Sequence, residues 1–350
     1  MKYKSSAIET VQWTLECDLT NETEKLIYNL LKLKGYSEDA LSTTDLLLLY
    51  CKDLMLSIPP FPRNVKFSKQ FECPSEYKKA LEEFVQKVKN GEDLTPFMSE
   101  RVRKNLDGND MLLSDWGIYH FHLTRRFRQD GTARRSEYQI FACCHNESMY
   151  FIQIYRHDKK CLYAQEDLLR IVKENWPDLL SKYQLNEINP SNEKVNSEER
   201  EQLRNAHIMT MTVINKNVYF SPGGGYASDG SSVVAVRYRN KMFGFIRLLE
   251  SKFKNNMSKF LDCIKKVKGT LVNKNLKLTA VSIDRNNLIL FEINNGLIFV
   301  CPLMEEEIIL SPIDHIPIFY EKPDHWIVPK ISICEVLENR FGKNASEIYL

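Results

Sequence analysis

The chain has 350 residues, and its hydrophobic content of 43% and charged content of 27% are those of an ordinary folded protein. Lys and Arg number 48 against 46 Asp and Glu, so the whole-chain charge excludes any general electrostatic argument for a nucleic-acid partner. Only a local patch of positive charge can support one.

The sequence shows no pattern typical of a membrane span, a signal peptide or a set of disulfide bonds. No stretch reaches the roughly 18 apolar residues of a membrane span, and the first residues lack the apolar core of a signal peptide. The nine cysteines include no Cys-x-x-Cys pair, which argues against a zinc ribbon or a disulfide framework. We expect a cytoplasmic protein without membrane association.

Residues 1–108 are predicted to be mainly helical. Three segments, residues 20–35, 42–56 and 75–91, each begin with capping residues, continue with apolar positions at helical spacing, and end near Gly or Pro. Nothing in this region is a catalytic pattern. We therefore expect it to pack against other parts of the chain or to bind a protein partner.

Residues 109–190 change to strand patterns. Residues 118–123 alternate, residues 138–145 and 149–157 form a hairpin around a polar turn, and residues 164–175 form a helix that ends before Pro177. The order of three strands and a helix predicts a small antiparallel sheet with a helix against one face.

The polar and charged residues 186–205 are interpreted as a linker or a short exposed helix. After them we expect a strand over residues 231–239, a helix over 242–253, a three-stranded meander over 276–302 and a final helix over 331–341. The predicted fold class is α+β, with a helical N-terminal region (1–108), a central α+β domain (109–190) and a C-terminal α+β domain (191–350).

The central strand carries the strongest candidate for chemistry. Successive side chains of a strand point to opposite faces, so His120 and His122 share one face. The other face is apolar, with Tyr119, Phe121 and Leu123. If those three residues enter the core, both imidazoles turn toward a cleft or toward solvent.

A run of arginines follows directly, at Arg125, Arg126 and Arg128, with two more at Arg134 and Arg135. Between residues 115 and 160, basic side chains outnumber acidic ones by three, and aromatic residues such as Tyr155 are interleaved. Guanidinium groups bind phosphate and aromatic faces stack on bases, so this composition suits a polyanion. The alternative is a solvated hairpin, where positive charge discourages edge pairing.

Three histidines with nearby arginines can cleave a phosphodiester without a metal or another cofactor. Imidazole titrates near neutral pH, so His120, His122 and His157 can supply the general acid and base, while arginines hold the charge on the phosphate oxygens. This is the chemistry of ribonucleases that use the 2′-hydroxyl as nucleophile, which favours RNA over DNA. In outline the predicted sheet is similar to that of bacterial ribonuclease toxins, which implies a toxin or defence effector.

Two alternatives to this hypothesis remain. The pair His120 and His122 could hold a divalent metal if a third ligand came from His145, His157, Asp115 or Asp158, and the short match His120-Phe121-His122 resembles the motif of HUH endonucleases. The other alternative is a non-catalytic module for protein or nucleic-acid interaction, in which the histidines are structural.

The segment from Ser221 to Tyr226 is a second candidate site. Its three glycines, Gly223, Gly224 and Gly225, would let consecutive backbone amides turn toward an anion. The segment lacks the Lys-Ser/Thr ending of a P-loop, and a plain turn between strands is the competing interpretation. If it is functional, we expect a loop that grips substrate.

Overall fold

The computed structural model describes residues 14–98, 110–145, 147–190 and 195–255, together with 257, 261, 273, 275–285, 287–294 and 296–303. The fold class is α+β, as predicted. Contacts divide the chain into two compact units. Unit 1 is built from Met1–Leu47 and Arg239–Leu350, and unit 2 is Leu48–Tyr238.

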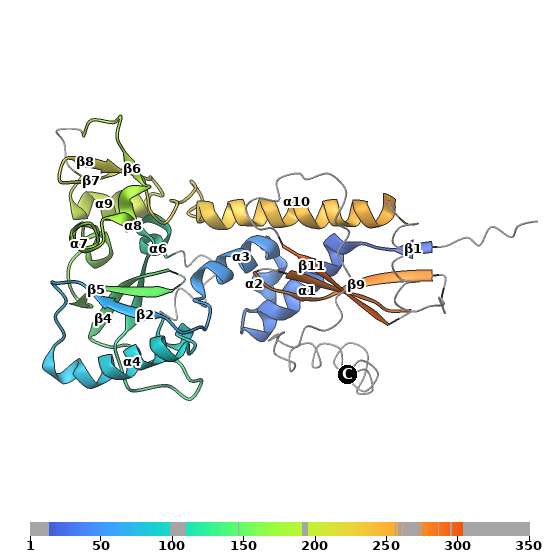
Figure 1. The fold of residues 1–350 in the computed structure, drawn as a ribbon, viewed down its shortest axis with the longest axis horizontal. Helices are drawn as coiled ribbons and strands as arrows, with labels where there is room; N and C mark the ends of the chain where they lie inside the picture. Colours follow the sequence, from blue (N-terminus) through green and yellow to red (C-terminus); the bar gives the residue numbers. More distant parts are fainter. Residues whose placement is uncertain are drawn as a thin grey trace, which may run out of the picture. The chain divides into compact units, whose positions relative to one another are not determined.

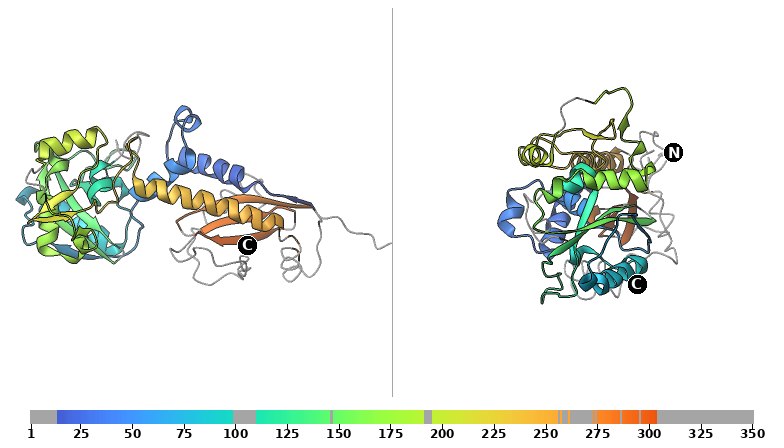
Figure 2. Two further views of the ribbon diagram at one scale, coloured as in Figure 1. Left: turned by 90° about the horizontal axis from the view of Figure 1, so that it is seen from above. Right: turned by 90° about the vertical axis from the view of Figure 1, so that its left-hand side faces the viewer.

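Unit 1 is organised around a four-stranded sheet with the order β1-β9-β10-β11. β9 to β11 form the predicted antiparallel meander, and β1 adds to β9 in parallel. Figure 2 shows the later part of the long helix α10 and the helix α1 beside this sheet. The bounds are β1 Thr14–Glu16, α1 Leu19–Leu33, α2 Glu38–Ser42, β9 Asn275–Ile283, β10 Asn287–Glu292 and β11 Leu297–Pro302. Two helices contain residues of both units: α3 Leu46–Leu56 belongs mostly to unit 2, and α10 Val233–Asn255 belongs mostly to unit 1.

The strand predicted over residues 231–239 is wrong, because the chain is helical there from Val233 onward. Val233, Val234 and Val236 favour strands by local propensity, but that preference is weak and is overridden in a packed helix. The Ser232 hydroxyl accepts the Ala235 N–H at 3.5 Å, a helix-capping contact. The predicted helix over residues 331–341 lies outside the described residues.

Unit 2 is built on a second four-stranded sheet with the order β2-β5-β4-β3 (Figure 1). β3, β4 and β5 are antiparallel, as predicted, but the parallel edge strand β2 comes from the region that was predicted to be helical. The elements of this part are β2 Asn64–Phe67, η1 Ser75–Tyr77, α4 Lys78–Asn90, η2 Thr95–Phe97, α6 Met111–Trp116, β3 Ile118–His122, β4 Tyr138–Cys144 and β5 Ser148–Arg156.

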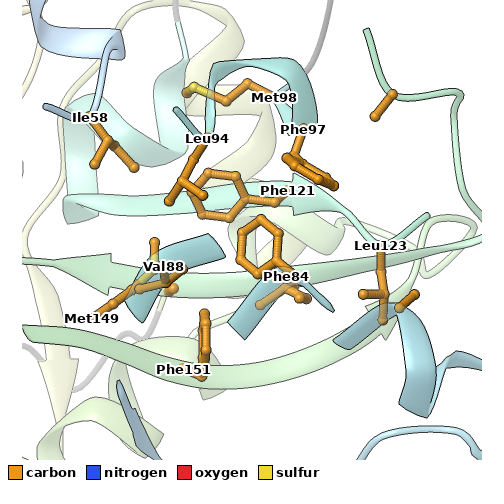
Figure 3. Close-up of a cluster of buried hydrophobic side chains, with 14 of the residues drawn as sticks. Ile58, Phe84, Val88, Leu94, Phe97, Met98, Phe121, Leu123, Met149 and Phe151 are labelled. Carbon is orange, nitrogen blue, oxygen red and sulfur yellow. The ribbon is translucent and has the colours of Figure 1, made fainter. Parts of the chain in front are cut away.

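Helices cover both faces of this sheet. On one face, Phe121 of β3 packs against Phe84 of α4, with ring centroids 5.1 Å apart, and Phe84 meets Phe97 at 5.0 Å (Figure 3). On the other face, a second cluster joins Trp116 of α6 and Phe141 of β4 to the apolar side of the helix α7, Asp167–Asn175. The sheet therefore has no solvent-facing side in its centre.

The rest of unit 2 follows β5 in sequence. It comprises η3 Leu162–Ala164, α7 Asp167–Asn175, α8 Asp178–Ser181, β6 Gln184–Leu185, α9 Ser197–Asn205, β7 Thr212–Ile214 and β8 Asn217–Tyr219. The domain boundaries that we predicted from the sequence, near residues 108 and 190, both fall inside this unit. The segment interpreted as a linker or a short exposed helix holds the helix α9, but Arg200 and Arg204 of this helix are buried.

No helix in the described part of the chain is long and apolar enough to cross a membrane.

Candidate functional site

The alternation predicted for β3 is confirmed. Phe121 and Leu123 lie in the core under α4, and Tyr119 packs against the same cluster. His120 and His122 lie on the opposite face, but they are only 7% and 8% exposed, so the prediction that they turn toward a cleft or solvent is wrong. Residues after β5 cover this face, where the ring of Tyr163 lies 5.0 Å from that of His120.

A polar row crosses the three antiparallel strands at one end of this face. His122 of β3 pairs in register with Gln139 of β4, which pairs with Tyr155 of β5. Gln139 is 1% exposed, and its Oε1 accepts the hydroxyl of Tyr163 at 2.9 Å. The row places amide, imidazole and phenol groups together where an apolar sheet face would ordinarily continue.

His157 follows β5 and completes a cluster with His122. The two rings are parallel within 5°, and their centroids are 6.1 Å apart. Nη2 of Arg135 lies 3.1 Å from Nδ1 of His157. Because guanidinium can only donate, Nδ1 must be the accepting nitrogen and the ring carries its proton on Nε2.

Both histidines of this cluster are shifted toward the neutral form. Burial, followed by the nearby His120 and His157, lowers the pKa of His122 to about 4. Burial and the charge of Arg135 also lower the pKa of His157. The backbone N–H of Ser136 approaches Nδ1 of His122 at 3.4 Å, which again leaves the proton on Nε2. At neutral pH both rings are uncharged.

His120 has a different partner, Asp110, which the sequence analysis missed. Nδ1 of His120 is 3.3 Å from Oδ2 of Asp110, an ion-pair distance, although the angles do not make a hydrogen bond. Asp110 also caps α6 by accepting the N–H of Leu113 at 2.9 Å. An Asp directly before a short apolar run was the available signal for this cap.

The arginine run lies on the loop between β3 and β4, where it is exposed. Arg125 pairs with Glu83 at 2.7 Å. Arg126 and Arg134 face each other across the small ladder next to the Phe127–Ala133 bridge, with the Arg134 N–H donating to the Arg126 carbonyl. Neither side chain has a carboxylate partner among the described residues. Like charges opposite each other are unfavourable, and a bound polyanion would relieve that repulsion.

The remaining predicted side chains take various positions. Arg128 is exposed on the same loop, and its N–H donates to the carbonyl of Thr132 at 2.8 Å. Tyr155 is half-buried, and Nζ of Lys159 lies 3.8 Å over its ring. Thus the structure brings together His122, His157 and Tyr155, while Arg125, Arg126 and Arg128 lie on the neighbouring loop.

The triglycine segment is part of the packing around α6. The N–H of Gly223 donates to the carbonyl of Asp115, that of Gly225 to Ser114, and that of Gly224 to Ser221. A Cβ at position 223 would stand 2.1 Å from the carbonyl oxygen of Leu113. These three amides already donate to carbonyls within the chain. In this structure the segment therefore stabilises the packing around α6, and a role in gripping substrate forms no part of the function proposed below.

Asp115, a candidate metal ligand, instead forms a buried ion pair. Its Oδ2 accepts from Nε and Nη2 of Arg204 at 3.0 and 2.8 Å, and its Oδ1 accepts the hydroxyl of Ser221 at 2.6 Å. The guanidinium of Arg204 lies 4.2 Å over the ring of Trp116. Within the described residues, no three His, Cys, Asp or Glu side chains gather as metal ligands would.

Comparisons with known proteins give no further guidance. No protein family, no curated protein and no solved structure matches this chain.

Proposed function

We propose that unit 2 is a ribonuclease that binds single-stranded RNA along the β3–β4 loop and cleaves it at His157 and His122. One observation carries the proposal. The parallel imidazoles of His122 and His157 stand beside the guanidinium of Arg135, next to a loop with two exposed arginines that have no acidic partner among the described residues. The arrangement supplies proton-transfer groups and phosphate-binding charge at one place.

A phosphate would change the protonation of the cluster. Its negative charge would offset that of Arg135 and raise the pKa of both imidazoles, since opposite charge favours the protonated form. When Arg135 turns to the phosphate, Nδ1 of His157 is released and can accept the proton of the 2′-hydroxyl. The 2′-oxygen then attacks phosphorus, and the 5′-oxygen leaves with a proton from the imidazolium of His122.

The products of this step are a 2′,3′-cyclic phosphate and a 5′-hydroxyl end, and no cofactor is consumed. His120 is as buried as His122, and its Nδ1 lies beside Asp110, so we assign it the role of supporting His122 and the surrounding packing. A protein partner for the N-terminal helices and a role as a toxin or defence effector stay predictions.

A second function is favoured by one observation. His122 is 8% exposed and has a pKa lowered to about 4, which makes it a poor proton donor at neutral pH. In this alternative the loop binds RNA through its arginines, and the histidines stabilise the sheet without taking part in chemistry.

The test uses the full chain with labelled single-stranded RNA and DNA of one sequence, with and without EDTA. For a ribonuclease we expect RNA cleavage that EDTA does not inhibit and that a single 2′-deoxy substitution at the cleaved position abolishes. His157→Gln should lose cleavage and keep RNA affinity, while the exposed His145→Gln serves as control. Binding without cleavage under all conditions would favour the second function.

The arginines are tested separately by binding. Removing both Arg126 and Arg134 by substitution with Gln should weaken RNA binding and reduce the slope of log K against log salt by about two, one for each phosphate contact. The matched control is Arg170→Gln, an exposed arginine of α7 that pairs with Asp167. Equal behaviour of the double variant and the control would rule out the loop as the RNA-binding surface.

A further inference from the structure

Unit 2 contains a cavity of about 340 Å³ next to α9. None of its described lining residues belongs to the cluster of His122 and His157. This volume lies within the range of small-ligand sites. The described residues that line it come from the start of α7, the segment after β6, α9 and the strands β7 and β8, and they are Glu166, Ile188, Asn189, Pro190, Val195, Arg200, Thr210, Met211, Val213 and Val218.

Arg200 is the unusual member of this lining, because it is a charged residue only 2% exposed. Its guanidinium donates to Oγ1 of Thr210 at 2.9 Å and to the carbonyl of Met211 at 3.5 Å. No carboxylate of the described chain pairs with it, since the carboxylate of Asp115 is held by Arg204. Asp115 favours the charged form of Arg200 through space, but its carboxylate is already paired with Arg204, so the buried guanidinium of Arg200 is only partly compensated. A buried cation in that position is costly, which makes this side of the cavity a place for an anionic group.

Glu166 gives the cavity a second charge of opposite sign. It lines the same space, is partly exposed, and forms no ion pair with Arg200 or with another described residue. The cavity therefore presents one cation and one anion that do not neutralise each other by direct contact. A ligand with both charges would satisfy both walls, whereas a simple anion would face Glu166 unfavourably.

Apart from the polar residues Asn189 and Thr210, the rest of the described lining is apolar. Val213 of β7 and Val218 of β8 line the cavity, and Ile188 and Met211 are 44% and 45% exposed. No aromatic side chain is among the described lining residues, so a nucleobase would lack the stacking partner that such ligands commonly use. The surface suits a branched aliphatic group.

We propose that this cavity binds a free aliphatic α-amino acid, with its carboxylate on Arg200, its ammonium group on Glu166 and its side chain against Val213 and Val218. The site is separate from the proposed ribonuclease centre and does not depend on it. Recognition requires both charges and the apolar group at once, so each can be removed from the ligand in turn.

The experiment is isothermal titration of the full-length protein with L-leucine. Parallel titrations use 4-methylpentanoate, which lacks the ammonium group, and 3-methylbutylamine, which lacks the carboxylate. Guanosine monophosphate and inorganic phosphate test the nucleotide and plain-anion alternatives. We expect saturable binding of leucine, at least tenfold weaker binding of either truncated ligand, and none of the phosphates.

Two variants locate the binding site. Glu166→Gln should weaken leucine binding at least tenfold and leave 4-methylpentanoate unaffected or improved, while the exposed Glu187→Gln should match the wild type. Arg200→Gln should abolish binding, with its folding checked by circular dichroism. No leucine binding at 10 mM, equal affinity for 4-methylpentanoate, preference for guanosine monophosphate, or an unchanged Glu166→Gln variant would each overturn the proposal.

Discussion

Replacing Asp115 with Asn tests the buried ion pair that joins α6 to α9. The substitution preserves the shape of the side chain but removes its charge, which leaves Arg204 buried beside Trp116 without a counter-ion. Asp115 also favours the charged form of Arg200, so two buried guanidinium groups lose their shared anion. Breaking such a pair from one side costs about 3–5 kcal/mol.

The assay is urea unfolding followed by tryptophan fluorescence, because Trp116 and Trp176 both belong to unit 2. With an m-value of about 2 kcal/mol per molar urea, the midpoint should fall by roughly 2 M. Asp158→Asn is the control, since Asp158 forms an exposed pair with Arg156 and its loss should cost under about 1 kcal/mol. If the free energies of unfolding of Asp115→Asn and of this control differ by less than about 1 kcal/mol, the ion pair between Asp115 and Arg204 does not hold α9 in place.

Two further predictions concern backbone packing and acid stability. Gly223→Ala should destabilise unit 2 by about 3 kcal/mol in the same assay, because its Cβ would collide with the carbonyl of Leu113. Gly244→Ala, in open space on the part of α10 that belongs to unit 1, should stabilise unit 1 by about 0.5–1 kcal/mol, measured by unfolding followed by circular dichroism. The folded-state pKa of His122 is about 4 against 6.5 unfolded, so the unfolded chain binds more protons between these values. Stability should therefore fall by about 2–3 kcal/mol from pH 6.5 to 4, and His122→Gln should flatten that slope; an unchanged slope would contradict the burial argument.

Local patterns in the sequence were sufficient to predict many of the strands and helices of unit 2. The alternation of residues 118–123 and the hairpin formed by β4 and β5 depend on neighbours a few positions apart, and the structure confirms both. The ends of helices could also be predicted from the sequence, as at Gly91, which ends α4 in a left-handed conformation.

Long-range pairing could not be predicted in this way. Asp115 was considered as one possible third metal ligand, because nothing local reveals its ion-pair partner Arg204, which lies 89 positions away. The exposure of His120 was misjudged for the same reason, since the covering residue Tyr163 belongs to another element. Likewise, nothing in residues 64–67 indicates that they add to β5 in parallel.

The order of the chain in unit 1 affects how the protein can be made. β1 pairs with β9, and the hydrogen bond from Thr14 to Asn275 spans 261 positions. A ribosome adding about 5–20 residues per second releases β9 roughly 10–50 s after β1. All of unit 2 emerges in that interval, so it can fold first while β1 and the apolar side of α1 await their partners. Nascent chains stalled before residue 275 should accordingly bind chaperones through their first 47 residues.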